Sequence, residues 1–141
     1  MTLTRIYLPL NAAGLRELQA GGVLAGRPLR AHAVTAAVRA AQPSGDEEDW
    51  EYTALCDAAS SSRLLLTHGE GRRIVAAADV TSTLVQEEAP GQAITPSAVV
   101  VSEAVPLKRI ASFHVDEAGA GDDEELLWYD ATELAQLVEL L

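Results

Sequence analysis

The feature that most constrains the fold is a local pattern that recurs along the chain. A short apolar run ends in Asn, Asp or Thr, and an alanine- and leucine-rich segment follows. The clearest copies are Arg5–Leu10 before Asn11 and Leu126–Tyr129 before Asp130. Such a side chain can accept hydrogen bonds from the free N–H groups in the first turn of a helix. Each copy therefore predicts a strand, a capping residue and a helix in that order.

Weaker copies of the pattern occur at 31–34 before Thr35 and at 74–78 before Asp79. Strands that alternate with helices usually form βαβ units, whose strands are parallel. The length of 141 residues is that of one ordinary domain. We therefore expect a single α/β domain over residues 1–141, with a mixed, mainly parallel sheet of about five or six strands flanked by helices.

The longest helix is predicted over 45–67. Ser44 and Glu47 have capping-box spacing, and further acids follow in the first turn. Trp50, Ala54 and Ala58 recur at helical spacing, which predicts that Trp50 is largely buried.

Two β-branched runs, 97–105 and 110–115, are separated by only four residues, 106–109. This connection is too short for a full helical crossover. We expect either antiparallel pairing of the two runs or one turn of helix between them.

The charge balance argues against one class of partner. The chain has 10 Lys and Arg against 21 Asp and Glu, a net charge of −11, with acids concentrated at 46–51 and 122–125. A nucleic acid backbone is repelled by such a field, and the basic residues form no stripe, so we expect no nucleic acid partner. The acidic runs are typical of a solvated face, and a docking site for a basic partner is the alternative.

The single cysteine, Cys56, cannot form an intrachain disulfide, and its alanine- and leucine-rich flanks predict a small core residue. The opening residues lack the pattern of a signal peptide, and no run reaches 18 apolar residues. We expect a cytoplasmic protein that does not enter a membrane.

The candidates for catalytic or metal-binding residues are His114, Asp116, Asp79 and Asp130. His114 and Asp116 share one face of a predicted strand because side chains alternate along it. In a mainly parallel sheet the three aspartates gather at the carboxyl edge, where open α/β sheets bind ligands. They could then hold Mg²⁺, with His114 as a base. The simpler interpretation, which we favour, is that each aspartate is only a cap or turn residue and that no cofactor is bound.

A Ser–His–Asp triad can also be written from Ser60, Ser61 or Ser62 with His114 and an aspartate. The strained G-x-S-x-G turn that presents a nucleophilic hydroxyl is absent. The sequence therefore does not favour this triad.

The segments at 5–10, 44–52, 113–116 and 127–130 resemble a small uncharacterised protein family of actinobacteria. The resemblance covers nearly the whole chain. It implies a cytoplasmic single-domain protein without an assigned activity, and it carries over no catalytic residue.

Two function classes follow. The first, which we favour, is a non-enzymatic interaction or regulatory module whose acidic surface engages a protein partner or a second copy of the chain. The alternative is a metal-assisted hydrolase or phosphoryl-transfer enzyme that uses Asp79, Asp116 and Asp130 with His114. Convergence of these side chains on one site would distinguish the second class from the first.

Overall fold

The computed structural model describes residues 2–26, 28–66, 71–88, 93 and 95–141. Its helices are α1 (Ala12–Gly21), α2 (Ala36–Ala41), α3 (Glu47–Leu64) and α4 (Leu134–Leu140), with short 3₁₀ turns η2 (Ser82–Leu84), η3 (Leu107–Arg109) and η4 (Ala131–Glu133). Its strands are β1 (Leu3–Leu10), β2 (Val23–Leu24), β3 (Leu29–Ala33), β4 (Ile74–Thr81), β5 (Val85–Glu87), β6 (Ala98–Val101), β7 (Val105–Pro106), β8 (Ile110–Val115) and β9 (Leu127–Asp130).

Seven of these strands form one sheet in the order β5-β6-β3-β1-β4-β8-β9, and β2 pairs with β7 in a separate two-stranded sheet. Every neighbouring pair in both sheets is antiparallel. The prediction of a mainly parallel sheet is therefore wrong.

The reason lies in the position of β1. Both β3 and β4 run antiparallel to β1, so they are parallel to each other, and α2 and α3 connect them. This connection is the helical crossover that the capping pattern predicts. However, β1 lies between β3 and β4 and turns one expected parallel pair into two antiparallel pairs. A local pattern along the chain cannot show which distant strand occupies that space.

Most of the predicted caps are confirmed. The side chain of Asn11 accepts a hydrogen bond from the N–H of Gly14 at the start of α1. In the same way, the Thr35 side chain accepts from the N–H of Val38 at the start of α2. Gly22 ends α1 in the left-handed conformation, at a φ of 75°. Asp79 does not cap a helix, because β4 continues through it to Thr81 and only the η2 turn follows.

The longest helix begins later than predicted. Asp46 is its N-cap and forms a capping box with Asp49, whereas the predicted cap was Ser44. The carboxylates of Asp46 and Asp49 both lie at the N-terminus of α3, close to the partial positive charge of the helix dipole. The helix ends at Leu64, and the predicted end at 67 lies outside the described residues.

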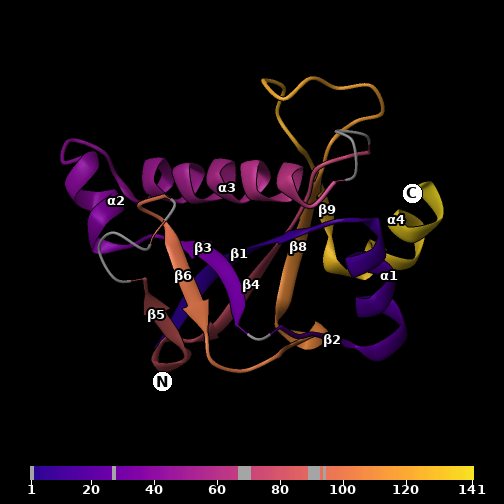
Figure 1. Ribbon diagram of the computed structural model, residues 1–141, viewed down its shortest axis with the longest axis horizontal. Helices are drawn as coiled ribbons and strands as arrows, with labels where there is room; N and C mark the ends of the chain where they lie inside the picture. The colour runs from indigo at the N-terminus through magenta and orange to yellow at the C-terminus, as the bar shows by residue number, and fades with distance from the viewer. Residues whose placement is uncertain (1, 27, 67–70, 89–92, 94) are drawn as a thin grey trace.

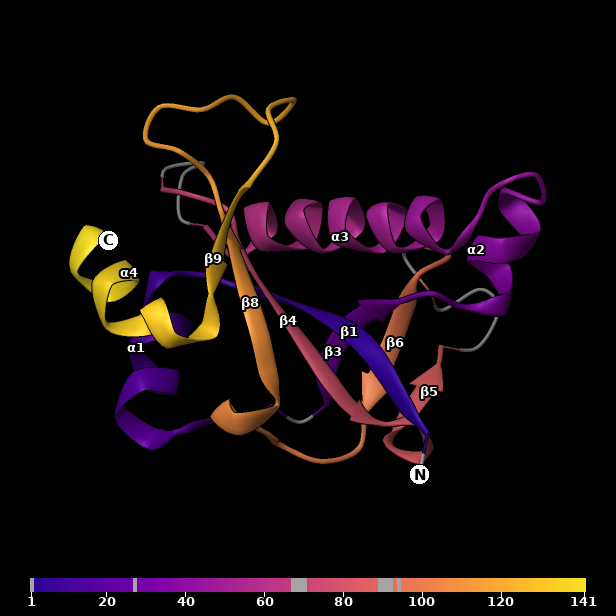
Figure 2. The ribbon, with the colours of Figure 1, turned by 180° about the vertical axis from the view of Figure 1, so that it is seen from behind.

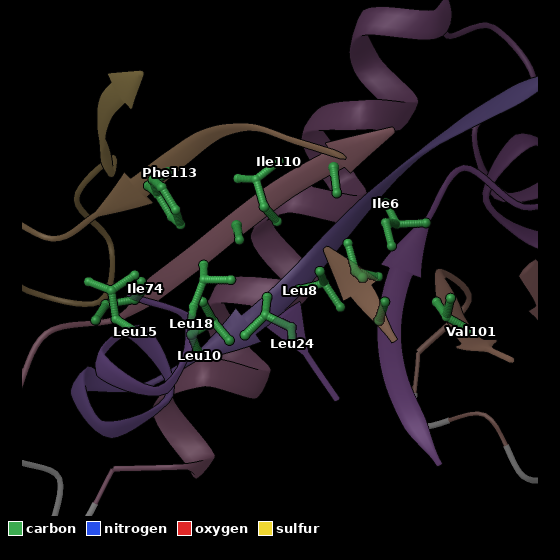
Figure 3. Packing of buried hydrophobic residues seen from close by; sticks show 14 of the residues in the cluster. Ile6, Leu8, Leu10, Leu15, Leu18, Leu24, Ile74, Val101, Ile110 and Phe113 are labelled. Carbon is green, nitrogen blue, oxygen red and sulfur yellow. The ribbon is translucent and has the colours of Figure 1, made fainter. Parts of the chain in front are cut away.

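The sheet is covered on both faces (Figures 1 and 2). Alternate residues of β1 and β4 point to opposite faces, as the pleat requires. On one face Tyr7, Val75 and Ala77 pack against α3. On the other face a larger cluster joins the sheet to α1, α4 and the β2–β7 pair, and Figure 3 shows Ile6, Leu8, Leu10, Leu15, Leu18, Leu24, Ile74, Ile110 and Phe113 within it.

Two side chains on α3 depart from the sequence prediction. The helix approaches the sheet through small residues, with Ala54 and Ala58 fully buried. Cys56, two positions from each, therefore points away from the sheet and is exposed. Trp50 is half-buried and packs beside α2, where its Nε1 donates to the carbonyl of Gln42 at 3.0 Å. Neither residue contributes to the core as predicted.

The predicted turn of helix between the last two β-branched runs is confirmed as η3. The runs themselves do not pair, because β6 lies between β5 and β3 whereas β8 lies between β4 and β9. No helix among the described residues has the length and apolar character needed to cross a bilayer.

Candidate functional site

Asp79 is paired with an arginine from the neighbouring strand. Arg5 lies directly opposite it in the β1–β4 register. The guanidinium donates through Nε to Oδ1 at 2.7 Å and through Nη2 to Oδ2 at 3.0 Å. Both side chains remain more than one-third exposed, at 36% and 38%. The Asp79 carboxylate therefore has a protein cation as its partner.

Asp116 has a more complete and buried set of donors. Its carboxylate accepts from Nε and Nη2 of Arg73, each at 2.8 Å, and from the backbone N–H of Arg73 at 3.0 Å. Arg73 also donates to the carbonyls of Asp122 and Glu124 at 2.8 and 2.9 Å. This pair anchors the loop 116–126, which extends beyond the sheet in Figure 1.

Asp130 serves as a cap. It accepts from the hydroxyl of Thr132 at 2.6 Å and from the Thr132 N–H at 2.9 Å. These two bonds, the hydroxyl first, lower the pKa of Asp130. His114 contacts Ser112 through Nε2 at 3.1 Å, and burial followed by the charge of Arg5 lowers the pKa of this imidazole.

The antiparallel sheet separates the three aspartates. Asp79 lies towards the end of β4, whereas Asp116 is paired with Arg73, the residue just before the start of β4. Asp79 lies six positions after Arg73, and six steps of extended chain span about 20 Å. Within the part of the chain that the structure describes, no three His, Cys, Asp or Glu side chains are grouped to hold a metal ion. The aspartate metal site stays a prediction that these contacts do not favour.

The strand β9 forms one exposed edge of the large sheet. Trp128 on this strand is 61% exposed and Leu127 is 43% exposed. Trp128 lies opposite His114, which itself lies opposite Val75, so both side chains are on the face that α3 partly covers. A large aromatic side chain is thus presented on an edge strand.

The backbone of β9 is also oriented for pairing. The N–H of Asp130 donates to the Glu133 carboxylate at 2.8 Å and so points away from β8. Because the direction of backbone groups alternates along an antiparallel strand, the N–H and C=O of Trp128 also point away from β8. No further strand lies beyond β9 among the described residues.

An acidic groove lies next to this edge. It has a volume of about 200 Å³ and is lined by Tyr52, Leu55 and Cys56 of α3 and by the loop at 122–126. All four acids from Asp122 to Glu125 are exposed. Arg73, which also lines the groove, is already paired with Asp116.

A second polar cluster lies at the other side of α3 and centres on His32 of β3. Nδ1 of His32 is 2.8 Å from the hydroxyl of Ser97, and Nε2 is 2.8 Å from the hydroxyl of Ser61 on α3. Ser97 in turn donates to the Asp57 carboxylate at 2.6 Å. His32 is buried, and burial lowers its pKa, while Asp57 and Glu88 oppose part of this shift.

The carboxylate determines the direction of these hydrogen bonds. A carboxylate can only accept, so the Ser97 proton points to Asp57 and the Ser97 oxygen accepts from Nδ1–H. In the neutral ring, which the lowered pKa of His32 favours, Nε2 is then unprotonated and accepts the proton of the Ser61 hydroxyl. The result is a continuous chain from Asp57 through Ser97 and His32 to Ser61.

Ser61 and His32 line a cavity of about 230 Å³. Its other lining is mainly apolar and comes from Pro9, Ala31, Leu64, Leu65 and Ala98. Arg30 and Glu88, which are 2.7 Å apart, lie at the same cavity. The chain of polar side chains therefore ends at a space that a small molecule can enter.

Sequence reasoning did not find this cluster. The triad weighed from the sequence, and not favoured there, paired Ser60, Ser61 or Ser62 with His114, which the structure places beside Ser112 instead. The available signal was the four-residue spacing of Asp57 and Ser61, which puts both on one side of a helix. The contribution of His32 depends on the sheet order, which the local pattern does not contain.

The fold and these sites define a protein with a central antiparallel sheet, an edge strand beside an acidic groove and a small cavity next to one helix. The chain belongs to the family of unknown function DUF6912, which matches residues 4–138. No curated protein and no solved structure matches it.

Proposed function

We propose that this protein is a cytoplasmic interaction module that binds an extended, basic segment of a protein partner along β9. The observation that carries this proposal is Trp128, which is 61% exposed on an edge strand. Edge strands with outward backbone groups accept an added strand, and alternate side chains of that strand then meet the flanking surface.

Charge favours a basic occupant over a second copy of the chain. The protein carries a net charge of −11, so two copies repel each other. The acids at 122–125 lie directly before β9, and the groove between them and α3 is open to a lysine or arginine side chain. A cation can also lie over the face of Trp128. The lowered pKa keeps His114, its cross-strand neighbour, uncharged at pH 7.

The binding test uses a short fluorescent peptide of alternating lysine and valine, with a matched peptide of alternating glutamate and valine. We expect anisotropy to detect only the lysine peptide, with weaker binding as NaCl is raised. Trp128→Ala should lower the affinity about tenfold or more, because central aromatic anchors dominate such interfaces.

Leu140→Ala is the matched control, because Leu140 is 55% exposed but lies on α4. It should leave peptide binding unchanged. Equal binding of the two peptides, or full binding by Trp128→Ala, would contradict the proposal. Light scattering that finds a dimer dependent on Trp128 would instead assign the edge to a second copy of the chain.

A further inference from the structure

The geometry points to a second activity: Ser61 is a nucleophile that accepts a short acyl group from an apolar ester in the cavity beside His32. The hydroxyl and Nε2 of His32 are 2.8 Å apart, which is the contact between a nucleophile and its general base. Ser97, held by Asp57, fixes the ring through Nδ1. This inference is independent of the β9 edge, because the participating residues lie on β3, on α3 and just before β6.

The protonation state of His32 suits this role. Burial lowers its pKa, so the ring is neutral at pH 7 and Nε2 is free to take a proton. The charged groups around it are Asp57 on α3, Arg30 on β3 and Glu88 after β5. Asp57 and Glu88 favour the imidazolium that forms when the proton arrives.

The cavity limits the substrate. Its volume of about 230 Å³ is below the roughly 300–1,000 Å³ of pockets for drug-sized ligands. The apolar lining from Pro9, Leu64 and Leu65 favours an uncharged chain. Arg30 also lines the cavity, and its Nη1 donates to Glu88 at 2.7 Å. Its remaining N–H groups are the donors proposed for the negative charge on the acyl oxygen.

The chemical step balances without a further reactant. The Ser61 proton moves to Nε2 of His32 as the Oγ–carbon bond forms. The bond from the acyl carbon to the alcohol oxygen then breaks, and the leaving alcohol takes the proton from His32. Ser61 remains as an ester, and no electrons are gained or lost.

The test uses an alkyl fluorophosphonate, which reacts with an activated serine by the same proton transfer and releases fluoride. We expect intact-mass spectrometry to show one adduct and peptide mapping to place it on Ser61. Ser60→Ala is the matched control, because Ser60 is the preceding residue on α3 and is exposed. This variant should be labelled at the rate of the unchanged protein, whereas Ser61→Ala should not be labelled.

His32→Gln tests the base separately from the fold. We expect labelling at least about 100-fold slower, the usual contribution of a positioned general base, with an unchanged circular dichroism spectrum. In the unchanged protein, labelling should slow only as the pH falls below 6.5, the ordinary pKa of histidine. No adduct on the unchanged protein at millimolar probe, an adduct on another residue, or equal labelling of a folded His32→Gln would overturn the inference.

Discussion

Two arginine–aspartate pairs make the same bidentate contact in different surroundings, and this difference sets their contributions to stability. Arg73 and Asp116 are buried, with side chains 7% and 2% exposed, whereas Arg5 and Asp79 are more than one-third exposed. Removing one member of a buried pair leaves an uncompensated charge away from water. An exposed pair is already screened by solvent.

We therefore predict that Asp116→Ala lowers the free energy of unfolding by about 3–5 kcal/mol. Asp79→Ala, its matched control, should cost no more than about 1 kcal/mol. Urea unfolding followed by circular dichroism measures both values. Equal losses in the two variants would show that burial does not determine the contribution of these pairs.

The buried His32 also predicts a pH dependence. Because its pKa is lowered in the folded protein, the unfolded chain binds more protons below the ordinary value of 6.5. The stabilisation is thus present above pH 6.5 and is lost as the pH falls through the folded-state pKa. The melting temperature should fall between pH 7 and pH 5, and less steeply in His32→Gln. His114, shifted in the same direction, accounts for part of the remaining slope.

At the scale of elements, the end of α1 contains two adjacent glycines with different backbone conformations. Gly21 is the last residue of the helix, and Gly22 has a φ of 75°. A Cβ at either position would meet no atom within 4 Å. Only the backbone preference of each residue therefore distinguishes the two positions.

Gly22→Ala should destabilise the protein by about 1–2 kcal/mol, because alanine disfavours the left-handed region. Gly21→Ala should stabilise it by about 0.4–1 kcal/mol, because alanine restricts the unfolded chain and suits a helix. Thermal melts of the two single variants check both signs. A loss in Gly21→Ala would show that its backbone is not helical.

The sequence predicted individual elements better than their arrangement. The caps at Asn11 and Thr35 and the stop at Gly22 depend on neighbouring residues, and all three are confirmed. Strand direction and order depend on β1 entering between β3 and β4, an interaction across many residues. The same limit applies to the sites, since His32, Ser61 and Ser97 come together only through the sheet order.

At the scale of the whole molecule, the structure predicts no response to divalent cations. Asp79 and Asp116 already contact arginines, and Asp130 caps η4. Millimolar Mg²⁺ or Mn²⁺ should therefore leave the melting temperature unchanged, whereas a bound ion would raise it by mass action. Calorimetric titration is the second measurement. Saturable binding lost in Asp116→Asn would restore the aspartate site as a hypothesis.

The central place of β1 has a consequence for synthesis. Its residues 3–10 pair with 74–81 on one side and, through Ile6 and Tyr7, with β3 on the other. During translation β1 is synthesised long before β4. Until β4 is made, the apolar side chains of β1 lack their contacts with it. Pairing of strands that lie so far apart in the sequence is intrinsically slow, and an unpaired apolar strand is prone to aggregate. Yield during expression should thus depend on chaperone supply and on translation speed between α2 and β4, more than on the final stability of the folded protein.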